Sequence, residues 1–223
     1  MAGSDVDRIV RQVLAPTEEL LFSEGFREVS SRQAYEKTYS GLSLSTLTPR
    51  VTFIPETGEI VLKPALAVAY RAIARIQVWL LGETNWKAGP ATFWTNLESL
   101  VQPDRRVTFR MVLGADSGPL LEQLLGAVRG EALPWLGRLA SDPERSITQV
   151  AARKETAHLA DGVQVALALA ALGRREEADQ VLQARIEEFL VKGDALAVET
   201  AREFRERVLE WMDEPGSRPR QKP

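Results

Sequence analysis

The sequence predicts an α+β fold: an antiparallel sheet of about five strands with covering helices, followed by an all-helical C-terminal segment. Between residues 33 and 113, short runs rich in Thr, Val, Ile and Tyr alternate with turn residues. Consecutive strands joined by short turns pair in antiparallel fashion. From Ser117 onward, apolar residues recur instead at every third or fourth position, which is typical of helices.

Three regions are expected along the 223 residues. Residues 1–150 form an α+β domain, residues 151–214 form a helical extension packed on it, and residues 215–223 form a disordered tail. The tail is rich in Pro, Arg and Lys and has too few apolar residues to fold. A chain of this length buries enough surface to fold without a disulfide or a metal.

The first element is a helix over 5–22, which Pro16 should kink or split and which Gly25 should terminate. Strands follow over 33–39, 41–54 and 59–68.

Two local features are expected in these strands. In 41–54 the apolar residues change phase, so a bulge is expected near Ser45–Thr46. The sequence Pro55-Glu-Thr-Gly58 predicts a tight turn between the second and third strands.

Residues 69–81 fit two patterns, because their apolar spacing is helical while their Ala, Ile and Val content also permits a strand. We expect an extended entry at 63–67 and a helix over 69–81 that ends at Gly82. Two further strands, over 92–100 and 106–113, complete the sheet.

The remaining elements are helices, the first of which Ser117 is expected to cap. The predicted helices are 118–129, a short one from Pro134, 144–172, 175–191 and 194–212.

Composition excludes several kinds of chemistry. The chain has no cysteine, which excludes disulfides, thiol catalysis and Cys-ligated metal, and its one histidine, His158, is interpreted as a surface residue. No cofactor and no metal are expected. The net charge of −3 and the lack of a basic patch argue against nucleic-acid binding. A polar start and the absence of a long apolar run predict no membrane span and a cytoplasmic location.

No standard catalytic or nucleotide-binding motif occurs. The glycine patterns of dinucleotide and phosphate loops are absent. The stretch Gly114-Ala-Asp-Ser-Gly118 has the wrong spacing for a nucleophile elbow. An enzyme therefore remains only as an alternative, in the form of a hydrolase that uses carboxylate, Ser and Arg side chains.

Residues 166–182 look like the helix–turn–helix core of a tetratricopeptide repeat, with small residues along the helices and Gly173 at the turn. Only one such unit is visible, so a single helical hairpin is the favoured interpretation. A helical adaptor in which residues 153–214 bind a partner peptide is a further alternative.

A family resemblance covers roughly residues 9–150. Gly25-Phe-Arg27, a strand rich in Tyr and Thr, Ile60-Val-Leu-Lys-Pro64 and Leu133-Pro-Trp-Leu136 occur in this order. The arrangement resembles a group of small bacterial domains of unknown function, some of which look like immunity or accessory proteins encoded near secreted toxins. The resemblance implies no catalytic residues.

The favoured function is non-enzymatic binding of another protein, with an immunity-like or accessory role, and the sequence leaves the oligomeric state open. Residues 153–214 carry a net charge of −5, which favours a basic protein partner. The possible partner contacts are Trp86, Glu176, Glu177, Glu187 and Glu188. The alternatives are that Trp86 folds back over the sheet and that the glutamates form only a solvated helical face.

Overall fold

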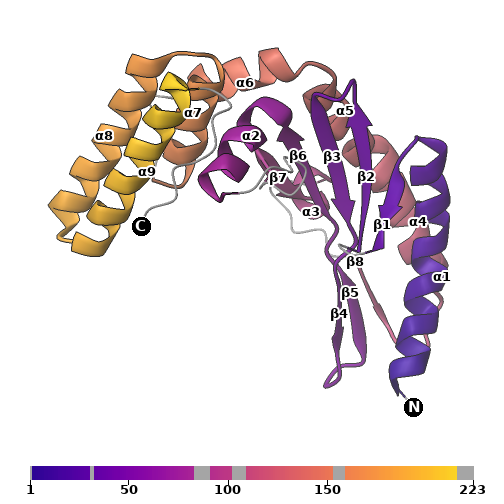
Figure 1. Cartoon of the computed structure of the whole chain (residues 1–223). Coiled ribbons are helices and arrows are strands. Elements are labelled where there is room, and N and C mark those ends of the chain that lie inside the picture. The colour runs from indigo at the N-terminus through magenta and orange to yellow at the C-terminus, as the bar shows by residue number, and fades with distance from the viewer. Residues whose placement is uncertain (1, 31–32, 83–90, 102–108, 153–158, 215–223) are drawn as a thin grey trace. The chain divides into compact units, whose positions relative to one another are not determined.

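The fold is α+β, as predicted, with a five-stranded antiparallel sheet, a second small sheet and a helical C-terminal region (Figure 1). The structure is a computed structural model. It describes residues 2–30, 33–82, 91–101, 109–152 and 159–214.

The chain divides into two compact units. The first unit comprises residues 1–68 and 93–141, and the second unit comprises residues 69–92 and 142–223. The second unit therefore contains the described part of the predicted extension and, in addition, helix α2 (Arg71–Leu80).

The larger sheet has the strand order β1-β2-β3-β6-β7. Its strands are β1 (Arg27–Val29), β2 (Ala34–Tyr39), β3 (Ser43–Thr48), β6 (Ala65–Tyr70) and β7 (Phe93–Asn96). The smaller sheet has the order β4-β5-β8. Its strands are β4 (Val51–Ile54), β5 (Glu59–Leu62) and β8 (Phe109–Val112).

Two prolines explain why the predicted strands 41–54 and 59–68 are each divided between the two sheets. Pro49 separates β3 from β4, and Pro64 separates β5 from β6. A proline has no backbone N–H to donate to a neighbouring strand, so pairing is interrupted at both positions. Figure 1 shows β4 and β5 continuing as a narrow ribbon beyond β3 and β6.

The expected bulge near Ser45–Thr46 is wrong. β2 and β3 pair in unbroken register, from Tyr35 opposite Leu47 to Tyr39 opposite Ser43. The change of phase that suggested a bulge is instead the break between two strands. The predicted turn is confirmed, because Ile54 pairs with Glu59 across residues 55–58.

Five helical segments complete the described part of the first unit. They are α1 (Ala2–Ser23), α3 (Leu97–Val101), α4 (Gly118–Ala127), the π-helical segment η3 (Val128–Ala132) and α5 (Leu133–Ser141). α1 continues through Pro16, so the predicted split is wrong: the helix is long enough to tolerate the missing hydrogen bond. α3 replaces the end of the strand predicted over 92–100, and Glu98 in its first turn suits the helix dipole.

The start of α4 differs from the prediction. Ser117 occupies the N-cap position but makes no side-chain capping hydrogen bond. The neighbouring Asp116 accepts a hydrogen bond from the Gly118 N–H at 3.0 Å instead. The hydroxyl of Ser117 therefore does not cap the helix.

Gly25 ends α1 in a left-handed conformation, and a substitution can test whether a glycine is needed there. Gly25 has a φ of +83°, and the N–H of Phe26 donates to the Leu21 carbonyl at 2.9 Å, as in a glycine-terminated helix. Gly25→Ala is expected to lower the free energy of unfolding by about 1 kcal/mol, since a Cβ is strained there. Gly126→Ala is the matched control: it lies in α4, its added Cβ meets no atom within 4 Å, and alanine should stabilise by about 0.5–1 kcal/mol. Urea unfolding that gave both variants the same sign would contradict this account.

The second unit is helical. Besides α2 it contains α6 (Pro143–Ala151), α7 (Leu159–Ala171), α8 (Arg175–Lys192) and α9 (Ala195–Asp213). The predicted helix over 69–81 is thus confirmed, and β6 supplies its extended entry. Trp79 is buried, and the guanidinium of Arg207 lies 5.8 Å from the centre of its ring. The helical hairpin around Gly173 is present as α7 and α8.

Tyr70 makes the stability of the second unit depend on alkaline pH. Its side chain is fully buried and hydrogen-bonded with Ser146, and burial raises its pKa from 10.0 to about 12. In the unfolded chain the phenol loses its proton near pH 10, whereas the folded protein retains it until about pH 12. Unfolding then releases a proton, so the free energy of unfolding should fall by about 1 kcal/mol between about pH 9 and 11.

Tyr70→Phe tests how much of this pH dependence of stability arises from Tyr70. Tyr35 and Tyr39 also have raised pKa values, mainly through burial, but both remain in the variant. The variant should therefore lose less stability than the wild type as the pH rises. Chemical unfolding at about pH 9 and about pH 11 measures the fall in the free energy of unfolding for each protein. An equal fall in the wild type and in Tyr70→Phe would show that Tyr70 does not contribute.

Candidate protein-binding site

Three of the four glutamates predicted as partner contacts have neighbours on their own helix. Arg174 donates to Glu177 at 2.6 Å, Lys192 pairs with Glu188 at 2.7 Å, and Gln183 donates to Glu187 at 3.3 Å. Such pairs at three or four residues' spacing add a little helix stability.

The four glutamates do not converge on one point of α8. Glu176 and Glu187 are eleven residues apart and share one stripe, about 16 Å long, while Glu177 and Glu188 form a second stripe about 100° away. Glu176 and Glu187 are exposed. Trp86 and His158 lie outside the described residues.

α8 and α9 form an antiparallel hairpin whose turn is specified by two adjacent residues. Gly193 takes the left-handed conformation that ends α8, with a φ of +70°. Asp194 follows as the N-cap of α9, and its side chain accepts a hydrogen bond from the Ala197 N–H at 3.0 Å.

Ion pairs connect the two helices away from the turn. Arg205 of α9 makes a two-pronged contact with Asp179 of α8. Arg175 at the start of α8 binds Asp213 at the end of α9 at 2.8 Å and 3.1 Å. The hydrogen bond from Arg175 lowers the pKa of Asp213, and the same bond raises the pKa of Arg175.

A groove of about 650 Å³ lies at the turn end of this hairpin. Its apolar lining comes from Leu190 of α8 and from Ala195 and Val198 of α9. Its charged lining residues are Asp194, Glu199, Arg202, Glu203 and Glu206. Four carboxylates and one guanidinium thus surround an apolar strip.

Exposed apolar side chains cluster at the turn where the groove lies. Leu190 is 52% exposed, and Val191 and Leu196 at the same turn are 89% and 75% exposed. These are three of the eight large hydrophobic side chains found exposed among the described residues. Clustered exposed apolar side chains rimmed by polar groups are typical of interaction sites.

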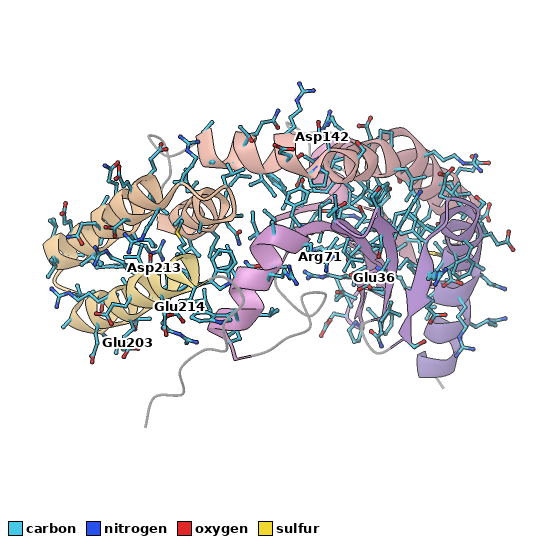
Figure 2. The ribbon with its side chains drawn as sticks, turned by 45° about the horizontal axis from the view of Figure 1, so that its top comes forward. Glu36, Arg71, Asp142, Glu203, Asp213 and Glu214 are labelled. Carbon is cyan, nitrogen blue, oxygen red and sulfur yellow. The ribbon has the colours of Figure 1, made fainter. Side chains whose placement is uncertain are left out.

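The carboxylates line up because of helical spacing. Glu199, Glu203 and Glu206 stand at positions i, i+4 and i+7 of α9, which places them on one face over about 10 Å. Figure 2 labels Glu203 on this helix, with Asp213 and Glu214 at the end of α9.

The sequence-based prediction included these three glutamates in the charge of residues 153–214 but did not name them as partner contacts. The signal that could have identified them is the i, i+4, i+7 spacing directly after a Gly-Asp turn. That turn brings Leu190 back beside Val198, which a linear sequence does not show.

The described lining of the groove consists of carboxylate, guanidinium and apolar side chains together with Gly193. In the described part of the chain, no three His, Cys, Asp or Glu side chains come together in a way that could hold a metal ion. None of the described helices combines the length and apolar composition needed to cross a membrane.

The chain matches no family model, no curated protein and no solved structure.

Proposed function

We propose that this protein binds a cationic, amphipathic segment of another protein in the groove at the turn between α8 and α9. The observation that carries the proposal is the arrangement of Leu190 and Val198 beside Glu199 and Glu206 in one open groove. An immunity-like or accessory role, as the family resemblance implies, is the proposed setting for this binding.

The two kinds of lining residue have different physical roles. Exposed carboxylates attract a cationic segment and raise its association rate, but each exposed ion pair adds little affinity. Burial of an apolar anchor against Leu190 and Val198 supplies about 25 cal/mol for each Å² removed from water. A segment with Lys or Arg on both sides of a Leu or Phe therefore satisfies both parts of the groove.

The matching experiment is a fluorescence anisotropy titration of the full chain with a labelled peptide of this pattern. We expect binding at about 0.05 M salt and binding weaker by about tenfold or more at about 0.5 M, because the Debye length shortens to a few ångströms. Two control peptides replace either the cations by Glu or the apolar residue by Gly. If the acidic peptide binds as tightly as the cationic one, the proposal is wrong.

A further inference from the structure

The nine residues that follow Glu214 carry the charge that the groove attracts. Residues 215–223 contain Arg218, Arg220 and Lys222 and no acidic side chain, which gives a net charge of +3. The second unit thus has an acidic groove on α9 and a cationic segment attached to the end of the same helix.

The segment is long enough to reach the groove. Along α9, Asp213 is about 10 Å from Glu206 and about 21 Å from Glu199, at 1.5 Å per residue. From Asp213 to Lys222 an extended chain spans up to about 30 Å. The segment is therefore long enough to reach both Glu206 and Glu199.

The spacing of the charges also fits. Arg218, Arg220 and Lys222 alternate with uncharged residues. Arg218 and Lys222 are four residues apart, which in an extended chain is up to about 13 Å, and the rise between Glu199 and Glu206 on α9 is about 10 Å. Two of the three cations can thus reach Glu199 and Glu206 at the same time.

We infer that residues 215–223 bind the groove of the same chain, with their cations on Glu199 and Glu206, and compete there with a partner segment. This inference rests on the groove that carries the proposed function. A partner segment would then bind the groove by displacing the tail.

The absence of cysteine from the chain allows a direct test. Gln221→Cys introduces a single thiol for a nitroxide spin label, whose paramagnetic broadening reports nearby backbone amides in NMR spectra of the full chain. At about 0.05 M salt we expect strong broadening at residues 198–206 that disappears at about 0.5 M. Broadening that is absent from these residues at low salt would overturn the inference.

Two further samples separate the possible results. Adding Glu199→Gln and Glu206→Gln to the labelled chain should remove the broadening if these carboxylates hold the tail. A mixture of spin-labelled chains with unlabelled, isotope-enriched chains should show none, because the contact is within one chain. Broadening in the mixture would mean that the tail binds a second copy, which contradicts the inference.

A titration distinguishes failure of the inference from failure of the proposed function. Replacing Arg218, Arg220 and Lys222 by Gln should make the cationic peptide bind about three- to tenfold more tightly, since individual exposed ion pairs are weak. Unchanged peptide affinity would leave the partner groove intact and refute competition by the tail. No binding by either protein would refute the partner groove, while the broadening experiment would still decide where the tail lies.

Discussion

Replacing Glu199 and Glu206 by lysine is expected to weaken binding of the cationic peptide by at least about tenfold at low salt. The double change turns two attractive contacts into two repulsive ones in the same groove. The loss should appear largely in the association rate and should shrink as salt is added. Stopped-flow measurement of the association rate checks this.

The matched control is Glu176→Lys with Glu187→Lys. It changes the net charge of the chain by the same amount but places the lysines on the exposed face of α8, outside the groove lining. Binding should change by less than about threefold. Equal losses in the two double variants would show that overall charge, rather than the groove, determines affinity.

Ile186→Ala is expected to reduce the free energy of unfolding by about 2–5 kcal/mol, the range for a truncated buried aliphatic side chain. Ile186 is 3% exposed and packs with Val198 and Ala201, with Phe189 against this cluster. Its loss leaves a cavity between α8 and α9 directly beneath the helix position that supplies Val198 to the groove. Urea unfolding followed by far-UV circular dichroism measures the change.

Leu196→Ala is the control for this prediction. Leu196 lies near the same turn but is 75% exposed, so its truncation should change the stability by less than about 0.5 kcal/mol. A small effect of Ile186→Ala, similar to that of Leu196→Ala, would mean that the two helices are not packed through this cluster.

Much of the fold could be predicted from local patterns. Glycines at 25, 58, 82 and 173 all take positive φ values where the sequence predicted a helix end or a turn. Helices α8 and α9 begin and end within about one residue of their predicted limits, because an αL glycine and an aspartate N-cap specify the turn between them.

Sheet partners could not be predicted in the same way. Pairing of β5 with β8 joins Glu59 to Val112 and Leu62 to Phe109, about fifty residues apart in the chain. Nothing in the alternation of either segment identifies the other as its neighbour. Pro49 and Pro64 are present in the sequence, and each divides a long strand between two sheets. That effect could not be predicted because it depends on which strands lie beside them.

The sequence predicted the acidic charge and the helices of the candidate site but not the groove. The acidic balance of residues 153–214 indicated a surface for a basic partner, and Glu176, Glu177, Glu187 and Glu188 were predicted as its contacts. The groove depends on the contact between the end of α8 and the start of α9. Only three-dimensional packing brings Leu190 and Glu199 to the same place.

The most direct test of the groove is a map of amide chemical shift changes in the full chain as the cationic, amphipathic peptide is added. The groove predicts that the largest changes fall at residues 190–206, on both sides of the turn at Gly193 and Asp194. Changes confined to the α8 face around Glu176 and Glu187, or to the first unit, would contradict the account.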